Sequence, residues 1–176
     1  MLTGLSIRDI VLVEALDLSF GPGLTVLTGE TGAGKSIILD ALGLATGARA
    51  DAGLVRGGAS QGVATANFSV PVDHPLWVSL EENGLTVEAG EDLILRRQQG
   101  ADGRSRAFIN DQPVTIAALR SLGEQLIEVH GQHETVGLLD PRNHRDVLDD
   151  WAGLEGRLAA TRQAWKARWQ ASRSAK

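Results

Sequence analysis

The sequence of 176 residues contains no cysteine, no long apolar run and only three lysines. Without cysteine the chain has no disulfide framework and no thiolate metal site, so thiols give no information about its redox compartment. No apolar run approaches the ~20 residues that a membrane-spanning helix needs. The N-terminus carries Arg8 and Asp9 inside its first apolar stretch and lacks the layout of a signal peptide. We therefore expect neither a disulfide-stabilised fold nor a membrane span.

The composition is that of an ordinary globular domain, with 43% hydrophobic and 22% charged residues. The net charge of −5 is unevenly distributed. Residues 151–176 contain six basic side chains against Glu155 alone, a balance of +5, whereas the other 150 residues carry 11 basic and 21 acidic groups, or −10. A basic helical tail on an acidic body indicates either a nucleic-acid contact or simply a solvated helix face.

The most informative stretch is Gly29-Glu30-Thr31-Gly32-Ala33-Gly34-Lys35-Ser36. It fits the pattern G-x-x-x-x-G-K-[ST] at every fixed position and follows the apolar run 24–27. The glycines let consecutive backbone N–H groups converge on a phosphate, and the following helix adds the positive end of its dipole. Lys35 can reach the β- and γ-phosphates, and the Ser36 hydroxyl can bind Mg²⁺. The motif predicts that ATP and Mg²⁺ bind here, the alternative being a glycine-rich turn in an ordinary βα unit.

Hydrophobic periodicity and turn residues predict the remaining elements. Strands are expected over 2–13, 15–20, 24–28 (leading into the phosphate loop), 62–71, 92–98 and 105–110, and helices over 35–46, 75–82, 115–128 and from 141 onward. The strands 92–98 and 105–110 form a hairpin around Asp102-Gly103, a pair that tolerates positive φ. The helix 35–46 is apolar nearly all round, which predicts burial on both sides.

The last predicted helix has two interpretations. Trp151, Leu158 and Trp165 are seven residues apart, which suits the apolar stripe of a coiled coil. Fewer than three to four heptads are present, so periodicity alone favours an ordinary amphipathic helix. The tryptophans on this basic helix indicate packing against the body or against a partner chain.

The parts that would cleave ATP are not recognisable in the sequence. A triphosphatase of this class needs an acidic residue at the end of an apolar strand to organise Mg²⁺. The nearest candidates, 147–150 and 126–128, both have helical surroundings. The segment 129–134 (VHGQHE) offers either two histidines for a transition metal or a loop that brings the Gln132 amide to Mg²⁺ or to a water near the γ-phosphate. The chain is thus expected to be the first half of a larger ATPase.

Three segments resemble the RecN family of bacterial DNA-repair ATPases, which are related to the SMC proteins. They are 29–50 (GETGAGKSIILDALGLATGARA), 103–110 (GRSRAFIN) and 129–134 (VHGQHE), in the order and spacing of that family. The resemblance implies an α/β fold: the N-terminal half of an ABC/SMC-type P-loop ATPase head, with an antiparallel β subdomain, leading into a coiled-coil helix. It implies a head segment over 1–140 and the start of a coiled-coil arm over 141–176.

The resemblance also implies a function, namely ATP-dependent head dimerisation that gates association with DNA during double-strand-break repair. ATP would be held by 29–36, Mg²⁺ by Ser36 and by Gln132 of a glutamine loop, and Arg56 would lie near nucleotide or DNA. The expected partners are the C-terminal half of the same head, a second head and double-stranded DNA, in the cytoplasm at the nucleoid and without a membrane. The complete protein would be an ATPase and this segment alone inactive. The competing hypotheses are a self-contained P-loop enzyme such as a small kinase, and a binding fragment that associates through its tail helix.

Overall fold

The computed structural model describes residues 1–29, 33–50, 52–82, 84–129 and 144–174. The chain divides into two compact units, Met1–Val129 and His130–Lys176, which are described separately below. The expected boundary between 140 and 141 lies outside the described residues, so the division into head and coiled-coil arm stays a prediction. Of the helices that the structure describes, none combines the length and the apolar character required to span a bilayer.

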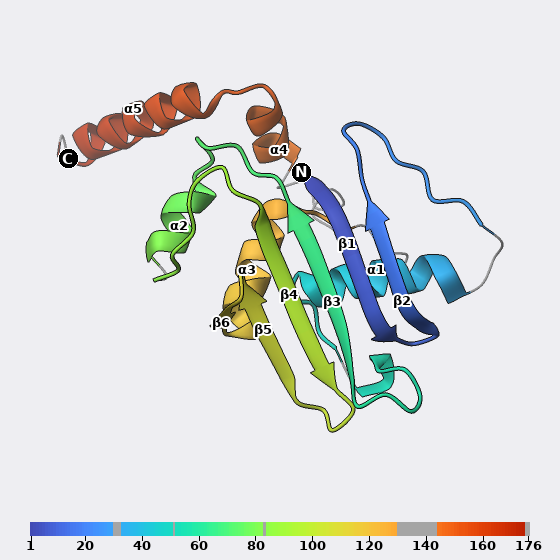
Figure 1. The fold of residues 1–176 in the computed structure, drawn as a ribbon. Coiled ribbons are helices and arrows are strands. Elements are labelled where there is room, and N and C mark those ends of the chain that lie inside the picture. Colours follow the sequence, from blue (N-terminus) through green and yellow to red (C-terminus); the bar gives the residue numbers. More distant parts are fainter. Residues whose placement is uncertain (30–32, 51, 83, 130–143, 175–176) are drawn as a thin grey trace. The chain divides into compact units, whose positions relative to one another are not determined.

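The first unit is built on one six-stranded sheet in the order β2-β1-β3-β4-β5-β6, in which all neighbours are antiparallel (Figure 1). The strands are β1 (Leu2–Ile10), β2 (Val13–Ser19), β3 (Gln61–Phe68), β4 (Leu93–Gly100), β5 (Ser105–Ile109) and β6 (Gln112–Val114). Side chains alternate between the two faces of a strand, and β3 and β4 bury every second residue. The predicted α/β class with an antiparallel subdomain is confirmed.

The strand β6 was missed in the sequence. It pairs with β5 across Asn110 and Asp111, whose φ values are 43° and 62°. Two consecutive residues with positive φ make the tight hairpin turn whose twist matches that of the strands, and Asn and Asp tolerate this conformation. The Asn-Asp pair is therefore the signal that would have predicted this hairpin.

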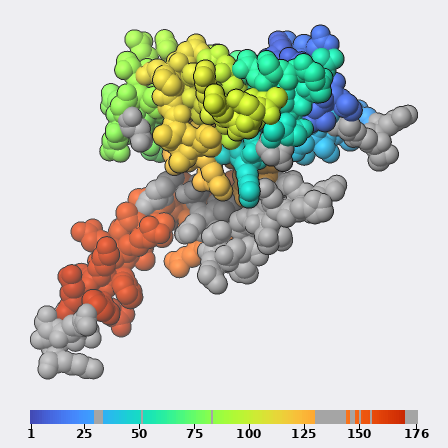
Figure 2. All heavy atoms as spheres, turned by 90° about the horizontal axis from the view of Figure 1, so that it is seen from below, coloured from blue at the N-terminus to red at the C-terminus, as the bar shows by residue number. Residues whose placement is uncertain are grey.

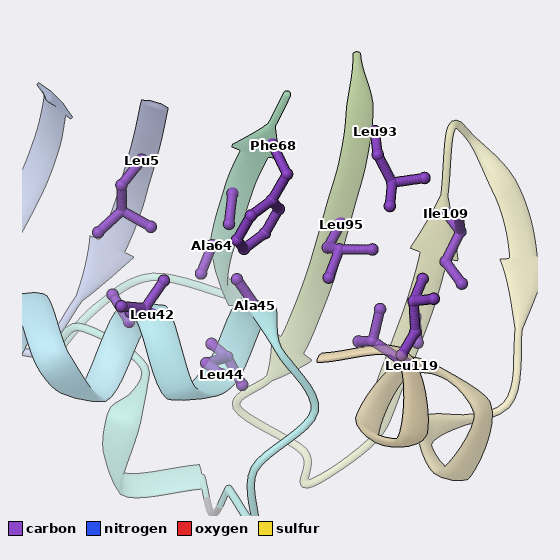
Figure 3. Packing of buried hydrophobic residues seen from close by; sticks show 14 of the residues in the cluster. Leu5, Leu42, Leu44, Ala45, Ala64, Phe68, Leu93, Leu95, Ile109 and Leu119 are labelled. Atoms are coloured by element: carbon purple, nitrogen blue, oxygen red, sulfur yellow. The ribbon is translucent and has the colours of Figure 1, made fainter. Parts of the chain in front are cut away.

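Helices cover one face of the sheet. They are α1 (Ala33–Ala45), α2 (Leu76–Glu82) and α3 (Ile116–Leu126), with a short 3-10 helix η1 (Ala52–Leu54). The helix α1 packs across β1, β3 and β4, and α3 packs on β5. Figure 3 shows Leu42 and Ala45 of α1 beneath Leu5 and Phe68 of the sheet, and Leu119 of α3 beside Ile109. In the space-filling view, the orange-yellow atoms of α3 adjoin the yellow-green atoms of the β4–β5 hairpin (Figure 2).

The predicted strand over 24–28 is wrong. Residues 24–29 form neither strand nor helix, and Leu24, Val26 and Leu27 are exposed by 93%, 68% and 43%. A strand exists only when its N–H and C=O groups pair with a neighbouring strand, and the sheet contains no partner for this segment among the described residues. The apolar pattern was correctly recognised, but the pairing that would turn it into a strand is missing.

The prediction that α1 is buried on both sides is also wrong. Ile37, Ala41 and Leu44 are buried against the sheet, whereas Leu39 is 46% exposed and Asp40 is exposed. A helix packed on a single sheet buries only the face that meets the sheet. In the described part of the chain nothing covers the other side of α1. The apolar residue Leu39 therefore lies in solvent.

In residues 144–174 of the second unit the structure has two helices, α4 (His144–Trp151) and α5 (Glu155–Ser174), where a single helix was expected. Gly153, with φ of +62°, ends α4, and the N–H of Leu154 donates to the carbonyl of Asp149. This is a common way to terminate a helix. The break places Trp151 and Trp165 on different helices, so their seven-residue spacing does not describe one continuous stripe.

Candidate functional site

The phosphate motif ends inside the first turn of α1. The helix begins at Ala33, so Gly34, Lys35 and Ser36 belong to its first turn, where no acidic residue is present. Unpaired backbone N–H groups and the positive end of the helix dipole attract an anion at such a position. The predicted passage from loop to helix is thus present, whereas the strand that should precede it is absent. Glu30, Thr31 and Gly32 lie outside the described residues.

The Lys35 side chain turns back over the motif. Its ammonium donates a hydrogen bond of 2.5 Å to the carbonyl oxygen of Gly29, the first residue of the motif. Lys35 is half-buried and Ser36 is exposed. A hydrogen bond thus joins the first residue of the motif to the cation that is expected to hold phosphate.

Arg56 lies at the turn between β1 and β2. Its backbone N–H donates to the carbonyl of Asp9 over 2.9 Å, and its guanidinium lies 3.5 Å from the Asp9 carboxylate and 3.1 Å from that of Glu14. The turn itself is unusual, because Asp9 and Val11 have φ values of 50° and 51°. A positive φ is strained for a β-branched residue such as Val11. In the described structure the bonds of Arg56 thus go to these two carboxylates and not to Lys35 or Ser36.

The other sequence-predicted groups give less information. Gln132, His130 and His133 lie outside the described residues, so neither the glutamine-loop nor the metal interpretation of this segment is tested. Within the part of the chain that the structure describes, no group of three or more His, Asp or Glu side chains could hold a metal ion. Asp149 lies in α4, where its carboxylate is 3.9 Å from Arg145, as expected for a helical residue.

Arg97 is a buried cation that the sequence patterns above do not predict. Its side chain is on the same face of β4 as Leu93 and Leu95 and is 3% exposed. Burial lowers the pKa of Arg97, because the charged form loses its contact with water. The signal was available in the alternation of residues 93–99, which places an arginine at a position where the pattern calls for an apolar residue.

The C-terminal end of α1 lies beside this arginine. Gly47, with φ of +91°, ends the helix, and the N–H groups of Gly47 and Ala48 donate to the carbonyls of Leu44 and Gly43. The guanidinium of Arg97 donates to the carbonyl oxygen of Ala48 over 2.5 Å. The helix α1 thus begins at the phosphate motif and ends beside the buried Arg97.

Comparison with known proteins identifies the family. The model of the family described as AAA domain matches residues 5–135. The DNA repair protein RecN of Xylella fastidiosa (strain 9a5c) is 44% identical over 171 residues, which cover 97% of this chain and 30% of that protein. RecN of Vibrio cholerae is 46% identical over 178 residues, which cover 100% of this chain and 31% of that protein. The chain therefore spans less than a third of the length of these relatives.

The fold is also found in a solved structure, the Smc head domain with a coiled coil and joint from Pyrococcus yayanosii. The match has a TM-score of 0.62 at 19% sequence identity and covers 98% of this chain and 36% of that chain. At this level of identity the similarity concerns the fold alone, and it agrees with the expected ATPase-head architecture. The chain thus belongs to the AAA domain family, and its predicted resemblance to the RecN-type DNA repair proteins is confirmed.

Proposed function

We propose that this chain is the ATP-binding head segment of a RecN-type DNA repair ATPase and that residues 29–36 hold ATP with Mg²⁺. The observation that carries the proposal is the complete phosphate motif, whose last residues lie in the first turn of α1 without an acidic neighbour in that turn. The RecN relatives that match nearly the whole chain support it.

The phosphates would be held by backbone N–H groups, by the dipole of α1 and by Lys35. In the structure the Lys35 ammonium donates to the Gly29 carbonyl, a neutral acceptor. A phosphate oxygen carries a formal negative charge and is the stronger acceptor, so Lys35 would exchange the carbonyl for phosphate. The hydrogen bond between Lys35 and Gly29 would then be replaced by one between Lys35 and the ligand.

Magnesium would be bound by the Ser36 hydroxyl and by Gln132. Mg²⁺ prefers oxygen ligands and usually reaches a protein through one or two side chains together with phosphate oxygens. Arg56 is proposed to act near nucleotide or DNA, for which it would have to leave Asp9 and Glu14. Those ion pairs are partly exposed, so releasing them costs little.

The groups that complete hydrolysis would come from the rest of the protein. The chain spans 30% and 31% of the two RecN relatives, and we propose that the remainder supplies the C-terminal half of the head. Residues 1–140 would form the N-terminal half, and 141–176 the start of a coiled-coil arm. A second head would join in an ATP-dependent dimer that gates association with double-stranded DNA at the nucleoid. A self-contained kinase is not favoured, because the matching relatives are DNA repair proteins.

Substitution of Lys35 by alanine tests the nucleotide site. The variant loses a charged hydrogen bond worth about 1.5–3 kcal/mol, which corresponds to a roughly 10- to 150-fold higher dissociation constant for ATP. Lys166→Ala, which removes an exposed lysine of α5, is the matched control and should bind like the parent. Affinity is measured with a fluorescent ATP analogue, and circular dichroism verifies folding. Equal affinity of Lys35→Ala and the parent would refute the site.

A further inference from the structure

Arg97 occupies a position that the packing alone would assign to an apolar residue. Its neighbours across the sheet are Ala64 on β3 and Ala107 on β5, both buried. Two flanking methyl groups leave room for a long side chain to pass between them and to reach beyond the sheet. The register of β3, β4 and β5 thus forms a slot around the arginine.

The buried charge of Arg97 is compensated by neutral groups. Its Nε donates to the Ser105 hydroxyl over 2.8 Å, and one Nη donates to the carbonyl of Ala48 over 2.5 Å. No carboxylate of the described residues forms an ion pair with it. A buried charge is costly, and a well-packed apolar side chain of similar volume often serves stability as well or better. Packing and stability therefore do not explain why an arginine occupies this position.

What the guanidinium reaches is the end of the helix that begins at the phosphate motif. Ala48 lies three residues beyond Ala45, the last residue of α1, on the turn that satisfies the carbonyls of the last helical turn. The negative end of the helix dipole favours a cation at this place. The planar guanidinium is held by the bond from its Nε to Ser105, so its Nη meets the Ala48 carbonyl from a fixed direction. A single ammonium on a flexible stem would not be oriented in this way.

The helix α1 is anchored at this end. The buried residues of α1 and its end concentrate in the second half, over 41–47 apart from half-buried Gly43, whereas Ile37 is the one buried side chain described in the first half. A Cβ atom on Gly123 of α3 would lie 2.4 Å from the carbonyl oxygen of Thr46, so the two helices touch there without slack. An α-helix of 13 residues is a rod of about 20 Å, and a displacement at one end moves the other.

We propose that Arg97 is a positioning residue for the phosphate loop, because it holds the C-terminal end of α1 and thereby fixes where Lys35 and Ser36 stand. The proposal rests on the proposed nucleotide site. According to this proposal, Arg97 influences the affinity for nucleotide although it lies outside the phosphate motif. Since the bond is to a backbone carbonyl, the identity of the residue at position 48 matters little and that of residue 97 matters much.

Arg97→Met removes the donors and keeps an unbranched apolar side chain in place of the methylene stem of the arginine. We expect the unfolding midpoint to be unchanged or raised and the dissociation constant for ATP to rise about tenfold, since small displacements of a binding group have large effects. Arg96→Met is the matched control, because Arg96 projects from the other face of β4, where it pairs with Asp111 and covers the Phe108 ring. The control should bind ATP like the parent.

Arg97→Lys keeps the charge without the planar guanidinium and should weaken ATP binding while the protein stays folded. If Arg97→Met does not fold, this variant decides. A second measurement, amide hydrogen exchange without nucleotide, should show faster exchange at residues 34–40 in the Arg97 variants than in Arg96→Met. Parental affinity and exchange in both Arg97 variants, with Lys35→Ala impaired, would overturn the proposal alone. Failure of the parent to bind ATP would overturn the nucleotide site, and hydrogen exchange would then still decide whether Arg97 positions the start of α1.

Discussion

Replacing Gly47 by alanine probes the contact between α1 and α3. Gly47 ends α1 with φ of +91°, a conformation that side chains of L residues rarely adopt. An ideal Cβ atom at this position would lie 2.6 Å from both the Cα and the backbone N of Arg120 in α3. Backbone atoms cannot turn aside as a flexible side chain would. The methyl group must therefore either separate the two helices or unwind the end of α1.

The expected cost has two parts. The left-handed conformation costs an alanine about 1–2 kcal/mol. Forcing an extra methyl group into a closely packed place costs about 1–3 kcal/mol more. Gly103→Ala separates the two parts, because Gly103 has φ of +82° in the β4–β5 turn and an added Cβ would meet nothing within 4 Å. We expect Gly103→Ala to lose about 1–2 kcal/mol and Gly47→Ala to lose about 2–5 kcal/mol.

Urea unfolding followed by circular dichroism measures both variants against the parent. Because all three proteins share the second unit, its contribution cancels in the comparison of their midpoints. The excess cost of Gly47→Ala over Gly103→Ala reports the close approach of α1 and α3. If both substitutions cost the same, the two helices do not touch at this place, and the anchoring of α1 would lose one of its supports.

Two further predictions concern pH and turnover. A hydrogen bond from Arg8 lowers the pKa of Asp17, so the stability that this pair contributes is present above the ordinary aspartate pKa of about 3.9 and is lost as the pH falls through the lower folded value. Asp17→Asn should lower the unfolding midpoint slightly at neutral pH and low salt, and should leave it unchanged below the folded pKa of Asp17 or in high salt, where an exposed pair contributes little. The 176-residue chain alone should hydrolyse ATP no faster than buffer, as measured by phosphate release. Positioning and charge stabilisation dominate phosphoryl transfer, and part of the groups that provide them is proposed to lie in the rest of the protein. Robust turnover by a monomeric chain would contradict the proposed dependence on a second half-head.

Local pattern predicted those elements whose partners lie in the described part of the chain. The strands β3 and β4 alternate buried and half-buried residues, so their period of two is visible in the letters alone. The Asp102-Gly103 pair predicts the hairpin, because Gly103 adopts the positive φ that the turn requires. For the phosphate motif, fixed spacing indicates the chemistry, and the structure places its end at the start of α1 as expected.

The role of Arg97 could not be predicted in the same way. Alternation shows that it faces the core, but not that Ala64 and Ala107 flank it, because the register between strands depends on turns and bulges far from residue 97. Nor does the sequence show that the end of α1 passes within hydrogen-bond distance of this arginine. Such a contact between residues 48 and 97 belongs to the packing of a helix on a sheet, which no local pattern encodes.

Two of the wrong expectations, a strand at 24–28 and an α1 buried on both sides, have one physical cause. Each was inferred from apolar side chains that need a covering layer, and the sheet covers only one side of α1 and none of the segment 24–28. Leu39 and Val26 are exposed for the same reason, on either side of the phosphate motif in the sequence. The apolar residues of a segment therefore predict that it needs a covering layer, and only the structure shows whether a neighbouring element covers it.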